Sequence, residues 1–218
     1  MIELKSIDMQ TTTVSTLAIP VCEDAEIHDG AVTPLTAIAR KLKDFSGKED
    51  EELMLYPPPA PKIERILFLG LGKCEKIDME RLRTAAGKAV KTCIKKNISD
   101  LVIAVPVHKK LLVNSEDIVQ AMVEGACLAN HVFDKYKKEK KLKPLKHISL
   151  SSDAVTAKTH ASLARRMNTI CQGTLLAREW VSTPSNDKSP DQLSKAIVSL
   201  AGKSGLKTTV WGPNELKQ

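Results

Sequence analysis

The sequence has few aromatic side chains and no long apolar run. Aromatic residues make up 3% of the 218 positions while 42% are hydrophobic, so aliphatic side chains and alanine must fill the core. This scarcity argues against base stacking on a nucleic acid. The most apolar run, residues 66–72, is far shorter than the roughly twenty residues that a membrane helix needs. We therefore expect a soluble globular protein with no membrane partner.

The N-terminus also lacks the features of an export signal. Acidic residues and the threonines at 11–13 stand where a signal peptide has a basic start and an apolar stretch. The five cysteines are odd in number and form no C-x-x-C pair, so we expect reduced thiols that pack as small hydrophobes. Both observations predict a cytoplasmic protein. The cysteines are Cys22, Cys74, Cys93, Cys127 and Cys171.

Positive charge is concentrated in one stretch. The formal net charge is +7, and residues 135–146 contribute much of it because Glu139 is the one acidic residue among their lysines. Such a run is typical of a solvated helix end and loop, and it is also a candidate contact for nucleic acid or another anionic surface. The lysines that would make this contact are Lys135, Lys137, Lys138, Lys140 and Lys141.

Short apolar runs alternate with helical patterns along the chain. This alternation predicts an α/β fold in which helices flank a mixed sheet. Four prolines, Pro57, Pro58, Pro59 and Pro61, predict an exposed connection between two of the strands, because proline cannot donate to a ladder. The expected strands are residues 2–7, 14–21, 53–56, 63–71, 101–107 and 148–150.

Capping residues mark the expected helices. Thr33 before Pro34 predicts a helix through residue 43, and Asp78 predicts a second helix that follows it. A third helix is expected from Ser115 to Tyr136, where apolar residues recur every three or four positions. The prediction for the next helix is that it runs from about residue 157 to 183 and bridges two domains.

A further unit begins after this long helix. Ser189, Pro190 and Gln192 form a capping-box sequence that opens a helix, and residues 206–211 alternate like a strand. One helix and one strand cannot bury a sheet, so we interpret this unit as the truncated start of another domain. The predicted organisation is an N-terminal domain at 1–155, an interdomain helix at 156–184 and the partial domain at 185–218.

Two motifs are candidates for a binding site. Gly70 and Gly72 lie between a strand and a helix, but Glu75 replaces the third glycine of a dinucleotide loop, and Cys74 replaces the Ser or Thr of a phosphate loop. A tight turn is the better interpretation. Cys127 and His131 would lie on one helical face, with Asp134 as a third metal ligand only by chance geometry.

The remaining titratable residues show no catalytic spacing. The histidines at 28, 108, 147 and 160 lack any H-E-x-x-H pattern and are interpreted as surface imidazoles. The acids at 49–52 are typical of a solvated loop rather than of an acid–base pair. We therefore assign no catalytic, cofactor-binding or metal-binding residue to this chain.

Four stretches in the same order resemble the leucyl (cytosol) aminopeptidase family. They are residues 68–73 (FLGLGK), 82–89 (LRTAAGKA), 123–137 (VEGACLANHVFDKYK) and 177–187 (AREWVSTPSND). The sequence departs from the usual family pattern at His131, Glu179, Trp180 and Ser182. These departures affect packing at the domain junction more than chemistry.

The resemblance implies a macrodomain-like N-terminal domain joined by a long helix to a catalytic domain. In the family, two divalent metals, Zn or Mn, activate water in that later domain, and the enzyme is a hexamer. None of the family's metal ligands falls on this sequence. We therefore expect an inactive portion that serves assembly and access control, with its own catalytic domain and identical subunits as partners. The alternatives are a binding module for nucleic acid or ADP-ribose, and a complete independent protein.

Overall fold

The computed structural model describes residues 1–217 except 10, 57–61, 108, 110 and 140. The predicted proline connection at 57–61 lies outside the described residues. The chain forms two compact units, Met1–Leu175 and Leu176–Gln218, and the boundary falls within a long helix. The three-part division at residues 155 and 184 stays a prediction. Among the described residues, no helix is both long and apolar enough to cross a membrane.

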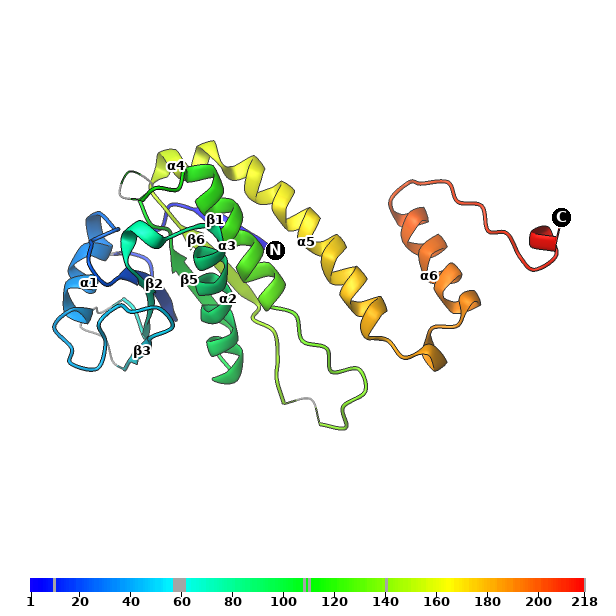
Figure 1. The fold of residues 1–218 in the computed structure, drawn as a ribbon, viewed down its shortest axis with the longest axis horizontal. Helices are drawn as coiled ribbons and strands as arrows, with labels where there is room; N and C mark the ends of the chain where they lie inside the picture. Colours follow the sequence, from blue (N-terminus) through cyan, green and yellow to red (C-terminus); the bar gives the residue numbers. More distant parts are fainter. Residues whose placement is uncertain (10, 57–61, 108, 110, 140, 218) are drawn as a thin grey trace. The chain divides into compact units, whose positions relative to one another are not determined.

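A six-stranded mixed sheet forms the centre of the first unit (Figure 1). The strand order is β1-β6-β5-β2-β4-β3, in which β3 pairs antiparallel with β4 and the other neighbours pair parallel. The predicted α/β fold class is confirmed. The strands are β1 (Ile2–Lys5), β2 (Leu17–Cys22), β3 (Glu52–Leu55), β4 (Ile66–Gly72), β5 (Asp100–Ala104) and β6 (His147–Ser151).

Helices cover both faces of this sheet. On one face, α2 (Met79–Lys95), α3 (Ser115–Ala129) and the start of α5 (Ala161–Ser182) share a core with Ala18 and Cys22 of β2. On the other face, α1 (Thr33–Ala39) packs against the alternate residues of the same strand. Burial on both faces explains why β2 and β4 have nearly continuous apolar sequences.

The contact between α2 and α3 depends on glycine. A side chain at Gly125 would place its Cβ 2.0 Å from the carbonyl oxygen of Arg83, and one at Gly87 would lie 3.4 Å from the oxygen of Gly125. The two helices therefore approach backbone to backbone. Beside this contact, Arg83 forms a salt bridge of 2.7 Å with Glu124. The second and third family-like stretches are thus the two sides of one helix–helix contact.

The edge strand β1 is held by a buried amide from α5. Asn168 Oδ1 accepts a hydrogen bond of 2.7 Å from the backbone of Ile2, and Asn168 Nδ2 donates to the carbonyl of Ile2 at 2.8 Å. The same Nδ2 donates to Ala164 at 2.8 Å, so the side chain, which is 2% exposed, is well satisfied. This side chain replaces the strand neighbour that β1 lacks on its outer edge.

Three helix boundaries differ from the sequence prediction, one of them the end of α1, which lies at Ala39 instead of residue 43. Thr33 is the first residue of α1 rather than its N-cap, because its hydroxyl donates to the carbonyl of His28. The helix after Ser115 ends at Ala129, so Phe133 and Tyr136 lie outside it. It ends there because the side chain of Asn130 exchanges hydrogen bonds of 2.7 and 3.0 Å with the backbone of Leu145.

The predicted bridging helix is interrupted near its start. It forms as α4 (Ala154–Thr159) and α5, separated at His160. Asp153 caps α4, as its side chain accepts from the backbone of Val155 and Thr156. The helix is therefore shorter than the pattern of apolar residues indicated, although it still ends just before Pro184.

The second unit contains the end of α5, a short 3-10 turn η4 (Ser185–Asp187) and α6 (Pro190–Lys203). The capping box of Ser189 and Gln192 is present as predicted. The prediction of a strand at 206–211 was wrong: none of these residues forms a strand or a β-bridge. A strand needs a neighbour, and the described part of this unit offers none.

Candidate functional site

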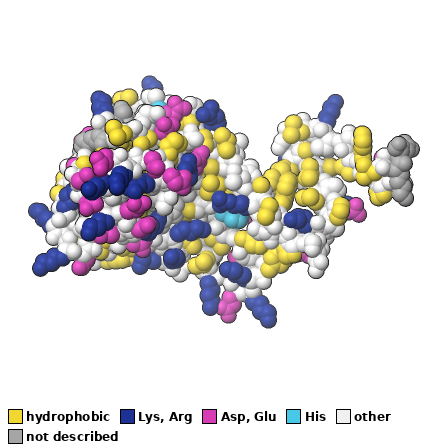
Figure 2. Space-filling view, viewed as in Figure 1, with side chains coloured by type: hydrophobic (Ala, Val, Ile, Leu, Met, Phe, Trp, Pro, Cys, Tyr) yellow, Lys and Arg dark blue, Asp and Glu magenta, His cyan; other side chains and the backbone are white. Residues whose placement is uncertain are grey.

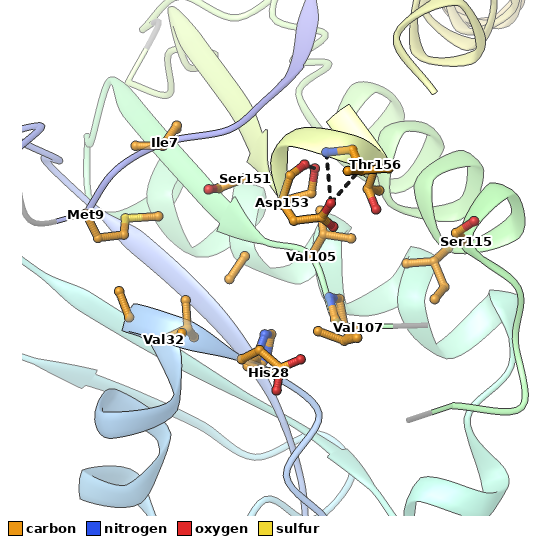
Figure 3. Close-up of a pocket in the computed structure, with 18 of the residues that line it drawn as sticks. Ile7, Met9, His28, Val32, Val105, Val107, Ser115, Ser151, Asp153 and Thr156 are labelled. Carbon is orange, nitrogen blue, oxygen red and sulfur yellow. Dashed lines mark hydrogen bonds between the residues drawn. The ribbon is translucent and has the colours of Figure 1, made fainter. Parts of the chain in front are cut away.

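A cleft lies where several parallel strands of the first unit end. Its volume is about 660 Å³, and the segments that follow β1, β2, β5 and β6 all contribute to it (Figure 3). The carboxyl ends of parallel strands are the usual place for ligands in open α/β sheets. This volume is within the range of small-molecule sites in proteins. The cleft is therefore the candidate site of this unit.

Apolar side chains form most of the cleft wall. Ile7 and Met9 follow β1, Val105 and Val107 follow β5, and Ile118 comes from the first turns of α3. Figure 3 shows Ile7 and Met9 across the cleft from Ser115. No sequence motif pointed to these segments. The signal that was present is the position of residues 105–107 at the end of one predicted strand and of residues 151–153 just after another.

His28 is part of this wall. The sequence had suggested a surface imidazole, and this prediction was wrong. Its side chain is 2% exposed, and Nε2 lies 2.6 Å from the carbonyl oxygen of Pro20. A carbonyl can only accept, so Nε2 carries the proton. The ring therefore joins the segment after β2 to the strand itself. Burial explains the error, because a lone histidine in a sequence gives no sign of its depth.

Asp153 gives the cleft a fixed negative charge. Its carboxylate accepts hydrogen bonds of 2.9 Å from the backbone of Val155 and Thr156. Hydrogen bonds from the hydroxyl and backbone of Thr156 lower the pKa of this carboxyl below its ordinary value. Asp29 adds a second carboxylate to the cleft lining, and Lys109 adds one positive charge. Among the described lining residues, most are apolar, and two carboxylates stand against one lysine.

A serine and a histidine meet at the edge of the cleft. Ser115 Oγ in α3 lies 2.9 Å from Nε2 of His160, the residue between α4 and α5. A hydrolytic triad needs a third group that orients the histidine. Among the described residues, the His160 ring makes this one hydrogen bond. We therefore assign the pair the structural role of joining α3 to the junction of α4 and α5.

The two glycines at the end of β4, Gly70 and Gly72, have a packing role. Gly70 lies inside β4 rather than in the turn, and a Cβ there would come 1.9 Å from the carbonyl oxygen of Lys48. Gly72 has a φ of +77°, which a glycine adopts without strain. The backbone of residues 47–51 thus occupies the space beside these glycines. The tight-turn interpretation holds for Gly72 but not for Gly70.

The acids at 49–52 are mostly exposed, as expected of a solvated loop, and they also have specific partners. Glu49 forms a salt bridge of 2.7 Å with Arg81, and Glu52 accepts from Thr92 at 2.9 Å. Glu51 accepts hydrogen bonds from the backbone and hydroxyl of Ser46. These contacts fasten the loop that crosses β4.

The metal geometry considered for Cys127 and His131 does not form. Because α3 ends at Ala129, His131 is not on the same helix as Cys127, and Cys127 is buried in the core. Among the described residues, no group of three or more Asp, Glu, His and Cys side chains could hold a metal ion. Of the other histidines, His147 is exposed and His108 lies outside the described residues.

The basic run forms an exposed loop between α3 and β6. Figure 2 shows Lys and Arg side chains gathered at the end of this loop. Lys141 pairs with Glu139 at 2.7 Å, and both side chains are largely exposed. Lys135 lies 5.4 Å from the centre of the Tyr136 ring. Lys137 and Lys138 are also exposed, and Lys140 lies outside the described residues.

Comparison with known proteins identifies the family of this fold. A sequence profile described as "Cytosol aminopeptidase family, N-terminal domain" matches residues 20–140. The chain belongs to the cytosol aminopeptidase family. The matched region runs from the end of β2 past β5 and includes the helices α2 and α3, whose glycine contact carries two of the family-like stretches.

Curated relatives agree with this assignment. A probable cytosol aminopeptidase of Desulfovibrio desulfuricans is 30% identical over 208 residues, which cover 91% of this chain and 41% of the relative. One of Clostridium perfringens is 26% identical over 211 residues, covering 95% of this chain and 42% of the relative. The chain therefore spans about two fifths of the length of these relatives.

Solved structures share the fold. A mutant tomato leucine aminopeptidase superposes with a TM-score of 0.74 at 18% identity, covering 99% of this chain and 45% of that one. The bottromycin maturation enzyme BotP in complex with Mn gives a TM-score of 0.71 at 19% identity. The match covers 94% of this chain and 40% of that one. At these identities the likeness shows a common fold.

Proposed function

We propose that the chain is the non-catalytic N-terminal portion of a cytosolic metalloaminopeptidase, and that it serves assembly and access control. The observation that carries this proposal is the match of residues 20–140 to the N-terminal domain of the family. The whole enzyme would release N-terminal amino acids from peptides in a hexamer. Two divalent metals, Zn or Mn, would activate water in a later domain, and the Mn complex of BotP supports such a metal.

The second unit supplies a surface for that later domain. Several of its large apolar side chains are exposed, among them Val181 at 80%, Leu206 at 65% and Trp211 at 67%. Figure 2 shows hydrophobic side chains on the surface of this unit. Clustered apolar side chains on a surface mark contacts with a partner. In the whole enzyme, the remaining catalytic domain would cover them.

Tryptophan fluorescence tests this contact. With Trp180→Phe as background, Trp211 becomes the one tryptophan, because the sequence has two. We expect its emission to lie at longer wavelength in this chain than in a polypeptide that continues into the catalytic domain, where Trp211 would be covered. Equal emission in the two polypeptides would show that this surface is not part of the domain interface.

The cleft favours a second candidate function, a binding module for a small ligand such as ADP-ribose. Its position at the carboxyl ends of the strands supports binding, but its two carboxylates, Asp29 and Asp153, oppose a diphosphate. Titration calorimetry with ADP-ribose measures this directly. Saturable heat that is lost in a Val105→Trp variant would establish the site, while an absence of heat would end this candidate.

The basic loop favours nucleic acid as a further partner. Its exposed lysines provide phosphate contacts, which predict saturable DNA binding that weakens steeply with added salt. Changing Lys137, Lys138, Lys140 and Lys141 together to Glu should remove this binding. A matched variant with the same number of exposed lysines changed elsewhere controls for net charge. If both variants bind equally, the loop is not the contact.

A further inference from the structure

Two cysteines that are far apart in the sequence lie on adjoining segments of the sheet. Cys22 is the last residue of β2 and pairs in register with Gly72 of β4, and Cys74 begins the 3-10 turn η2 (Cys74–Lys76) two residues later. Backbone hydrogen bonds join the two segments next to both cysteines. Glu23 donates to the carbonyl of Gly72 at 2.9 Å, and the Cys74 backbone donates to Asp24 Oδ1 at 2.9 Å.

The two thiols face each other on the same side of the sheet. Cys22 belongs to the core beneath α2, and Cys74 packs against that core. The two side chains are neighbours, since Cys74 contributes to raising the pKa of the Cys22 thiol. Neighbouring strands lie about 4.8 Å apart, and a disulfide joins Cα atoms about 4.4–6.8 Å apart. Cys22 is paired with Gly72, and the hydrogen bond from the Cys74 backbone to Asp24 holds the turn after β4 against the segment that follows Cys22.

The two thiols differ in their access to solvent. Cys22 is fully buried, whereas Cys74 is partly exposed. Burial, and then the neighbouring Cys74, raise the pKa of the Cys22 thiol. A reagent in solution therefore reaches Cys74 first, and Cys22 can react only with a group already attached to its neighbour.

We infer that Cys22 and Cys74 form a reversible disulfide site that a low-molecular-weight disulfide such as oxidised glutathione can oxidise. The Cys74 thiolate attacks one sulfur of the reagent, which breaks the reagent's S–S bond and releases one glutathione thiolate. The Cys22 thiol then attacks Sγ of Cys74 and passes its proton to the departing sulfur, which leaves as the second glutathione. The protein loses two electrons and two protons, and the reagent gains them as two thiols.

The same fold contains an internal control. Cys127 in α3 and Cys171 in α5 also share one core, but both are buried, at 6% and 2% exposure. The remaining cysteine, Cys93, belongs to α2 and is fully buried in the core. With no thiol at the surface to begin the exchange, these three residues should stay reduced for as long as the chain is folded.

The test is to incubate the folded chain with oxidised glutathione, block free thiols and digest with trypsin. Cleavage after lysine and arginine places Cys22 in residues 6–40 and Cys74 in residues 74–76. We expect these two peptides to be linked, two of the five thiols to be lost, and the linkage to reverse with dithiothreitol. The second step should be the slower one, so the mixed disulfide at Cys74 should accumulate first.

Two variants complete the test, each checked for folding by circular dichroism. Cys74→Ser, at the partly exposed position, should lose no thiols under the same conditions, while Cys93→Ser should still form the linked peptides. The inference is overturned if the folded chain yields no link between the two peptides. It is also overturned if Cys127 and Cys171 link first, or if Cys74→Ser loses thiols as fast as the unaltered chain.

Discussion

Replacing Gly125 with alanine tests the packing that joins two of the family-like stretches. The new Cβ would lie 2.0 Å from the oxygen, 2.8 Å from the carbonyl carbon and 3.0 Å from the Cα of Arg83. These are backbone atoms of another helix, so α2 and α3 must separate. Because both helices pack on the same core, separation also loosens their contacts with the sheet.

The expected loss of stability follows from two opposing effects. Overpacking against backbone costs about 3 kcal/mol at the upper end of its usual range, and alanine regains about 1 kcal/mol of helix propensity, which leaves a loss of about 2 kcal/mol. For a chain of this size, that loss corresponds to a melting temperature lower by about 4–8 °C. Urea unfolding followed by far-ultraviolet circular dichroism measures it.

Two other glycines provide matched controls. A Cβ at Gly173 in α5 meets nothing within 4 Å, so Gly173→Ala should be neutral or stabilise by up to about 1 kcal/mol. A Cβ at Gly87 would lie 3.4 Å from its nearest atom, so the stability of Gly87→Ala should lie between the stabilities of Gly125→Ala and Gly173→Ala. If Gly125→Ala and Gly173→Ala unfold at the same urea concentration, the close approach of α2 and α3 is refuted.

Two further predictions concern the first unit. Asn168→Ala should lower the free energy of unfolding by about 2 kcal/mol and speed hydrogen exchange in β1, because the backbone of Ile2 loses its partners; unchanged exchange would show that water replaces the amide. Asp153→Ala should cost about 1 kcal/mol at neutral pH through loss of the α4 cap. Because the folded pKa of Asp153 is lowered, this stabilisation is present above the unfolded pKa and lost as the pH falls through the folded one. The difference from the unaltered chain should therefore shrink below about pH 4, and a difference that persists there would exclude the carboxylate as its cause.

The sheet could be predicted because its strands are buried on one or both faces. Each of the expected strands in the first unit corresponds to a strand of the structure within a few residues, and Asp78 caps α2 as its sequence indicated. Such signals are local. Apolar runs, capping side chains and prolines act within a few residues of themselves, so a single sequence is enough to recognise them.

The failures came where distant contacts decide the structure. The end of α3 depends on Asn130 reaching Leu145, and no periodicity in the sequence reports that bond. The alternating residues 206–211 need a neighbouring strand before they can form one. The cleft is assembled from loops that only the strand order brings together, and the burial of His28 depends on the same arrangement. Even so, residues 105–107 and 151–153 could have been singled out by the rule for parallel strands.

The most direct test of the central claim is an assay of peptide-bond hydrolysis by this chain alone. Purified chain would be incubated with leucine amide in the presence of Mn²⁺ or Zn²⁺, with a full-length cytosol aminopeptidase as the positive control. If catalysis resides in segments outside these residues, the rate will equal the metal-only blank at every chain concentration. A metal-dependent rate that rises in proportion to the concentration of the chain would contradict the account.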